Sequence, residues 1–316
     1  MPEPLFYEGS PCAPPAFRTL LYLDGSLNDE TNAAGVTRLF DLFFAHYGEE
    51  AAWIAVADHE RKMRPRKLTE ARVDDARGWI NTPNKSFPAT CRVAGPLDDD
   101  LGAVTVPAFR VDEYRVPFVD LSVPDDLDRA LRFAEQVTAV IRDLPVIAGV
   151  MGLGFYLPVA LDSLAWFLPR TGQRYRAAIR PTVDGGTMGV RRTGEGFRWH
   201  EHPDVHPGLP DIGWRTIAGV DFLDRLGDLS ALDERDDVEV ERRPTMTLVT
   251  AGDHPVWGDV DRGDDLAPYR AVARALAPVR YPYEVAIGSL FGDQEFDPAG
   301  PEHVRAYLLR FDDERA

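Results

Sequence analysis

The sequence predicts an α+β fold, with mixed or antiparallel sheets and packed amphipathic helices. Three segments in a row (87–95, 103–111 and 116–123) have the composition of strands and are separated by turn clusters such as GPLDDDLG. Consecutive strands joined by short turns favour antiparallel pairing. Two other segments (36–47 and 127–141) repeat apolar side chains at the three-four spacing of a helix that packs on a sheet.

The N-terminal region begins with residues 1–16, which are rich in Pro and small residues and are typical of an extended arm. Short strands are expected at Phe17–Leu27 and Trp53–Asp58. His59–Arg72 is the one basic run of the chain and indicates either an anion site or a solvated face. No Gly-rich phosphate loop adjoins it, which favours the solvated face.

The ends of the two helices also have sequence signals. Thr31 or Asn32 can cap the start of the first helix, and Gly48 can end it. Asp125 is the expected N-cap of the second helix, whose acidic first turn complements the helix dipole.

The middle of the chain contains a glycine-spaced apolar segment, VIAGVMGLGFYLP (146–158). Its GLGF invites a nucleotide-loop interpretation, but neither GxGxxG nor GK[ST] follows. Close packing of a buried strand is the simpler explanation of Gly149, Gly152 and Gly154. A short helix is expected at 161–168. The turn-rich stretch 170–196 is the best boundary, so residues 17–316 form either one domain or two similar halves (17–169 and 170–316).

The C-terminal region predicts an apolar strand in TMTLVTAG (245–252) and a helix from Leu266 to Leu276. VAIGSLF (285–291) has the composition of a last strand. The tail at 302–311 fits a strand or a helix, since its periodicity does not separate the two.

Composition narrows the class of protein. The 316 residues contain 52 acids and 35 bases, a formal net charge of −17. This balance argues against direct binding of nucleic acid, which needs an excess of Lys and Arg. It is explained by solubility or by a basic protein partner. Two cysteines make no disulfide scaffold, and no signal peptide or apolar 18-residue span is evident, so we expect a cytoplasmic protein without a membrane anchor.

The densest acid lies in 221–241, with nine carboxylates against two arginines. A buried unpaired carboxylate is too costly for this segment to lie inside, so it faces water or a cationic partner. Trp199 and Trp214 precede it in the chain, near the histidine loop at 200–206, and are either aromatic anchors for a partner or ordinary core residues. The candidate partner-binding carboxylates are Asp224, Asp228, Asp233, Glu234, Asp236 and Asp237.

Histidines suggest a different chemistry. His200, His202 and His206 lie within seven residues and could hold a zinc ion. Pro203 and Pro207 exclude the helical HExxH geometry, and an exposed loop without metal is the alternative. His254 lies near carboxylates and could act as a general base, but Gly and Pro around it indicate an ordinary turn.

The C-terminal half also resembles a known family. The segments are PGLPDIGWRTIAGVDFLDRLGDLSAL, then TMTLVTAGDHPVWGDV with its strand ending in AG, then the Tyr-x-x-Val helix of DLAPYRAVARALAPVRYP. GLGFYLP and the turn at Gly186–Val190 are similar too. Together they resemble the TsiV-like immunity family of type VI secretion, over 146–291 well and over the first half loosely.

The resemblance implies a non-enzymatic cytoplasmic immunity protein that binds a cognate antibacterial toxin, often a nuclease, and needs no cofactor. An acidic surface could then occupy a groove that holds phosphate. Two alternatives stay open at this point. One is a metal-dependent hydrolase that uses His200, His202 and His206, and the other is an adaptor of a secretion locus that binds without inhibiting.

Overall fold

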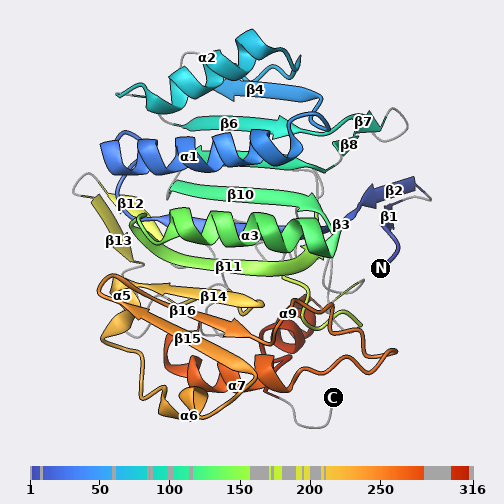
Figure 1. Ribbon diagram of the computed structural model, residues 1–316, viewed down its shortest axis with the longest axis vertical. Helices are drawn as coiled ribbons and strands as arrows, with labels where there is room; N and C mark the ends of the chain where they lie inside the picture. Colours follow the sequence, from blue (N-terminus) through green and yellow to red (C-terminus); the bar gives the residue numbers. More distant parts are fainter. Residues whose placement is uncertain are drawn as a thin grey trace.

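A single ten-stranded sheet runs through the molecule, in the order β15-β16-β14-β11-β3-β10-β9-β6-β4-β5 (Figure 1). All its neighbouring strands are antiparallel. Two-stranded pairs β1-β2, β7-β8 and β12-β13 lie outside it. The predicted α+β class with antiparallel pairing is therefore confirmed, and strands of both expected halves belong to one sheet.

The computed structural model describes residues 2–7, 10–58, 62–83, 85, 88–98, 103–104, 106–113, 117–156, 171, 174–179, 190–193, 196–199, 208–209, 211–280 and 300–312. The strands are β1 (Leu5–Tyr7), β2 (Ser10–Ala13), β3 (Pro15–Leu23), β4 (Trp53–Ala57), β5 (Arg66–Lys67), β6 (Ala89–Ala94), β7 (Leu97–Asp98), β8 (Ala103–Val104), β9 (Ala108–Glu113), β10 (Pro117–Pro124), β11 (Val146–Phe155), β12 (Val190–Thr193), β13 (Gly196–Trp199), β14 (Arg215–Gly219), β15 (Val238–Arg243) and β16 (Met246–Ala251). The helices are α1 (Glu30–Tyr47), α2 (Glu70–Asn81), α3 (Leu127–Ile141), α5 (Val220–Leu223), α6 (Ser230–Asp233), α7 (Ala267–Ala275), the 3-10 turn η3 (Ala277–Val279) and α9 (Gly300–Leu308).

Helices cover the two ends of the sheet on opposite faces. Figure 1 shows α1 and α3 crossing the front of the sheet, and Phe109 of β9 packs its ring against Phe40 and Phe43 of α1. In β15, Glu241 points to α3, where it bonds Arg142. The next residue, Arg242, points the other way and bonds Asp233 of α6, because side chains alternate along a strand. Helix α6 therefore lies on the face opposite α3.

Strand β11 lies in the interior of the sheet, between β14 and β3, and is buried along its whole length. A Cβ at Gly149 would lie 2.8 Å from Ile217 Cδ1, and one at Gly154 would lie 2.8 Å from the Ile179 carbonyl oxygen. Only glycine allows these neighbours to approach so closely. The buried-strand interpretation of this segment is confirmed, and it leaves no nucleotide loop there.

The helix ends differ from the expected caps. Helix α1 begins after Asp29, so neither Thr31 nor Asn32 caps it. Asn32 is buried instead, and its amide donates to the carbonyls of Asp24 and Ser26. Helix α3 is capped by Asp126, whose carboxylate accepts from the Arg129 N–H at 3.4 Å, and not by Asp125. The expected end of α1 at Gly48 is confirmed.

Several other elements differ from those expected from the sequence. Leu5–Tyr7 and Ser10–Ala13 of the expected arm pair as β1 and β2, and the first strand of the sheet is Pro15–Leu23 rather than Phe17–Leu27. Helix α2 was not predicted. The tail is helical (α9) rather than a strand. The helix expected at 161–168 and the strand at 285–291 lie outside the described residues, as does most of 170–196. No described helix combines the length and apolarity that crossing a membrane requires.

Candidate functional site

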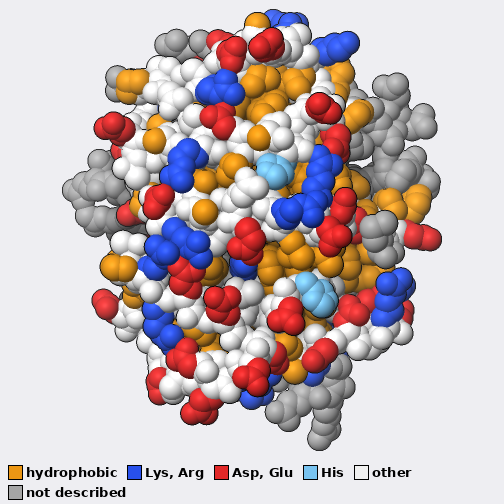
Figure 2. Space-filling model, viewed as in Figure 1, with side chains coloured by type: hydrophobic (Ala, Val, Ile, Leu, Met, Phe, Trp, Pro, Cys, Tyr) orange, Lys and Arg blue, Asp and Glu red, His pale blue; other side chains and the backbone are white. Residues whose placement is uncertain are grey.

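The acid-rich segment forms one edge of the molecule, through α5, α6 and the edge strand β15. Three apolar side chains hold it to the core: Phe222, Leu229 and Leu232 are 0%, 6% and 2% exposed. The polar residues between these anchors have no room in the core and face water. Figure 2 shows Asp and Glu side chains gathered over the lower part of the molecule, where Figure 1 draws α6 and β15.

Three of the six candidate carboxylates are exposed and unpaired. Asp224, Glu234 and Asp236 are exposed, and no hydrogen bond or ion pair joins their carboxylates to any other residue that the structure describes. We call these three the open carboxylates. They are available to a cation from outside the chain without first breaking an internal pair.

The other three candidates already have partners. Asp228 accepts from the backbone N–H and the hydroxyl of Ser230 at 2.9 and 2.8 Å, and these bonds lower the pKa of Asp228. Asp237 accepts two bonds from Arg235, at 2.7 and 2.6 Å, which lower the pKa of Asp237.

Asp233 makes the third of these internal contacts. It accepts two bonds from Arg242, at 2.9 and 2.7 Å, and both side chains are about half exposed (46% and 48%). Exposed pairs of this kind contribute only ~0–1 kcal/mol to stability. A partner's cation could therefore replace Arg235 or Arg242 at little cost.

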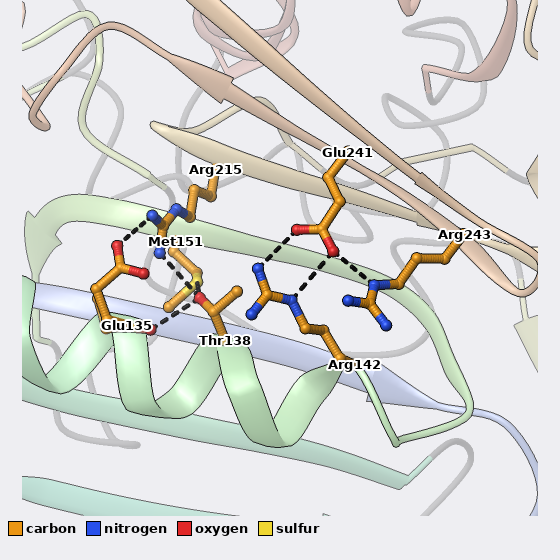
Figure 3. Close-up of polar contacts among 8 residues, drawn as sticks. Glu135, Thr138, Arg142, Met151, Arg215, Glu241 and Arg243 are labelled. Carbon is orange, nitrogen blue, oxygen red and sulfur yellow. Dashed lines mark hydrogen bonds and ion pairs between the residues drawn. The ribbon is translucent and has the colours of Figure 1, made fainter.

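Glu241, at the end of the same segment, has a structural task. It accepts from Arg142, the C-cap residue of α3, at 3.1 and 2.7 Å and from Arg243 at 2.5 Å (Figure 3). The bond from Arg142 is the main cause that lowers the pKa of Glu241. Two arginines thus neutralise this carboxylate, which joins β15 to the C-terminal end of α3.

A second contact of α3 lies beside it. Arg215 of β14 donates to the Thr138 hydroxyl at 2.9 Å and pairs with Glu135 (Figure 3). The Thr138 hydroxyl in turn donates to the Ala134 carbonyl at 2.8 Å. No sequence signal marks these contacts, because Arg142 and Glu241 are 99 residues apart.

The two candidate tryptophans have different outcomes. Trp214 is only 2% exposed; its ring meets Phe17 edge-on and its N–H donates to the Gly252 carbonyl at 3.0 Å. The structure therefore places Trp214 in the core, so that in this conformation it cannot anchor a partner. Trp199 pairs through its backbone with Val190, and its side chain lies outside what the structure describes.

The histidine candidates gain no support. His200, His202 and His206 all lie outside the described residues, and among the described residues no three His, Cys, Asp or Glu side chains form a metal-binding group. His254 is exposed after a left-handed Gly252, and no hydrogen bond or ion pair joins it to a described carboxylate. The nearby Asp259 is engaged by Arg174 through two 3.1 Å bonds.

The basic run 59–72 follows the solvated-face interpretation where it is described. Its residues 62–67 are exposed, and Arg66–Lys67 form the edge strand β5. Charged side chains on an edge strand also discourage pairing with other chains.

Comparison with known proteins identifies the family. A family model described as type VI immunity for VRR-NUC (TsiV) matches residues 128–300, more than half of the chain. The chain belongs to the TsiV family of type VI immunity proteins. The resemblance seen in the sequence is confirmed, and the match extends it to include α3.

A solved structure supports the fold. The chain is similar to the Pseudomonas aeruginosa type VI secretion system (T6SS) protein PA0821, with a TM-score of 0.71 and 18% identity over 99% of this chain and 91% of that one. At this identity the likeness shows a shared fold. No curated protein matches the sequence.

Proposed function

We propose that this protein is the immunity partner of a type VI toxin with a VRR-NUC nuclease domain. It binds the toxin directly in the cytoplasm, without catalysis of its own, and occludes the nuclease site with the surface formed by α5, α6 and β15. The open carboxylates Asp224, Glu234 and Asp236 carry this proposal, because they give a TsiV family member a ready set of unpaired negative charges.

The physical argument rests on complementary charge. A nuclease holds phosphate with Lys and Arg, so its groove attracts an acidic surface. Such attraction raises the association rate from ~10⁵–10⁶ toward ~10⁸ M⁻¹s⁻¹ at low salt. The exposed pairs Asp233–Arg242 and Asp237–Arg235 can rearrange to add two further carboxylates to the contact.

The test is charge reversal of the open carboxylates. The triple variant Asp224→Lys, Glu234→Lys and Asp236→Lys should bind the cognate VRR-NUC toxin with an association rate at least ~10-fold lower at low salt. The difference should shrink as salt rises, because salt screens exposed charges. Surface plasmon resonance at several salt concentrations measures both effects, and survival of toxin-producing cells measures protection.

A matched control keeps the net charge change the same. Glu49, Glu70 and Asp75 are exposed at the other end of the sheet, and their carboxylates also have no described partner. Their reversal to Lys should leave the association rate within ~3-fold of wild type, since these charges lie far from the proposed contact. Equal losses in both triple variants would reject the surface and leave only a net-charge effect. A complex that forms without protecting the cell would indicate an adaptor instead of an immunity protein.

A further inference from the structure

Two arginines face each other on the sheet surface opposite α1. Arg92 of β6 and Arg110 of β9 are directly opposed in the antiparallel register. Their neighbours along each strand are buried apolar residues of the core that α1 covers: Cys91, Val93, Phe109 and Val111. Because side chains alternate along a strand, both guanidinium groups project from the other face.

The charges in this place do not balance. Asp112 accepts from Arg110 at 3.1 Å and from Arg92 at 3.4 Å through the same oxygen, Oδ2. Asp120, which lies opposite Arg110 on the neighbouring strand β10, is bound by the buried Arg18 at 2.6 Å. Two guanidinium groups therefore share one carboxylate. Like charges directly opposite each other destabilise a strand pair unless a counter-charge lies between them.

Hydrogen-bonding capacity is also unused here. The Nε atoms of Arg92 and Arg110 are buried and have no hydrogen-bond acceptor. The hydroxyl of Thr90, which lies opposite Asp112, is also buried and has no hydrogen-bond partner. These are three of the nine such atoms among the described residues. Most buried polar groups in proteins are paired, so three unpaired ones on two adjacent strands indicate a missing partner.

The Phe118 ring orients one of the two arginines, and both are partly accessible to solvent. The Arg110 guanidinium lies over the Phe118 ring, 4.8 Å from its centre. The side chains of Arg92 and Arg110 are 25% and 22% exposed, so part of each meets solvent although Nε does not. Burial, and then the charge of Arg110, lower the pKa of Arg92. An anion bound between them would relieve both effects.

We propose that Arg92 and Arg110 form an oxyanion-binding site that holds one carboxylate or phosphate group. Arg binds such planar or tetrahedral oxyanions with paired N–H donors. Small side-chain movements would open the Nε–H groups to the ligand. Five strands separate β9 from β15, about 30 Å at normal strand spacing, so this site is distinct from the acidic surface and does not depend on the proposed function.

Arginine side-chain NMR tests the site directly. Inorganic phosphate or acetate is titrated into the full-length protein, with potassium chloride at matched ionic strength as a reference. We expect saturable shifts of the Arg92 and Arg110 Nε–H signals. Arg77 is the internal control, because its Nε–H already donates to Asp41 at 2.7 Å and should not shift. A tighter response to phosphate indicates a free phosphate, and an equal or tighter response to acetate indicates a carboxylate.

Variants identify the ligating residues. Arg92→Lys and Arg110→Lys keep the charge but lose the paired N–H geometry, so each should weaken the titrated anion's binding at least ~10-fold. The matched Arg77→Lys variant should bind as wild type does. The proposal is overturned by shifts that do not saturate, by equal shifts at Arg77, or by unchanged binding in the Arg92→Lys and Arg110→Lys variants. Because the wild-type titration stands alone, it decides the question even where a variant fails to fold.

Discussion

The ion pair between Arg310 and Asp211 differs from the pair between Asp233 and Arg242 in burial. The Arg310 and Asp211 side chains are 3% and 2% exposed, and Asp211 also accepts from the Tyr307 hydroxyl at 2.5 Å. Asp233 and Arg242 are about half exposed at the edge of the sheet. The chemical groups are the same, yet the first pair fastens the C-terminal segment after α9 to the residues before β14, and the second leaves charge at the surface.

The difference follows from desolvation. A charge without its partner inside a protein costs several kcal/mol, whereas an exposed charge returns to water. Buried charge therefore belongs to the fold, and exposed charge is free to serve recognition. The following changes test that division, from the largest expected effect to the smallest.

Removal of Asp211 should have the largest effect. Asp211→Ala leaves Arg310 buried without its carboxylate, and we expect the free energy of unfolding to fall by about 3–5 kcal/mol. Urea denaturation of the purified protein measures this loss. The double variant Asp211→Leu with Arg310→Met removes both charges and should recover part of it. A loss below ~1 kcal/mol would show that the pair contributes no more than a surface pair does.

The buried charge of Lys85 can be tested through the pH dependence of stability. It is 7% exposed and donates to the carbonyls of Leu27 and Thr82, and burial lowers its pKa to about 8. Between pH 8 and the unfolded pKa of 10.5, the unfolded chain holds this proton and the folded chain does not, so the contribution of Lys85 to stability rises with pH.

The comparison with Lys85→Met isolates this term from other titrating groups. The difference in unfolding free energy between wild type and variant should shift by about 1 kcal/mol in favour of wild type from pH 7.5 to pH 9.5. Denaturation of both proteins at the two pH values measures it. A difference that is constant with pH, or that falls, contradicts the lowered pKa.

The exposed pair should have the smallest effect. Asp233→Ala and Arg242→Ala should each change the unfolding free energy by less than ~1 kcal/mol, with a coupling of about 0.2–1 kcal/mol in the double-mutant cycle. The coupling should decrease in high salt. A salt-independent coupling above ~2 kcal/mol would mean that this pair belongs to the fold and is not available to a partner.

The sequence predicted elements whose pattern is strong. Helices α1 and α3 have long apolar faces at helical spacing, and β11 is apolar throughout. Helix α2 was not predicted because only three of its twelve residues, Ala76, Trp79 and Ile80, are buried, which leaves no long apolar face. The predicted N-cap of α3, Asp125, is one residue before the observed N-cap, Asp126. Both residues are equally suitable, and only backbone geometry distinguishes them.

The candidate site was predicted as a segment but not residue by residue. Composition placed 221–241 at the surface, since nine carboxylates cannot be buried together. It did not show that Glu241 bonds Arg142, that Asp233 bonds Arg242, or that Asp224 remains open. Trp214 likewise fitted a partner anchor and a core residue equally well until its 2% exposure was known.

The sequence by itself determined the α+β class, the main amphipathic helices, the acidic surface and the immunity family, because periodicity, charge density and family motifs are local properties of the chain. Tertiary structure alone decided which face each helix covers, which carboxylates are neutralised, and that Arg92 and Arg110 oppose each other across two strands. Strand register sets these contacts, and register depends on the fit of the whole sheet rather than on any one segment.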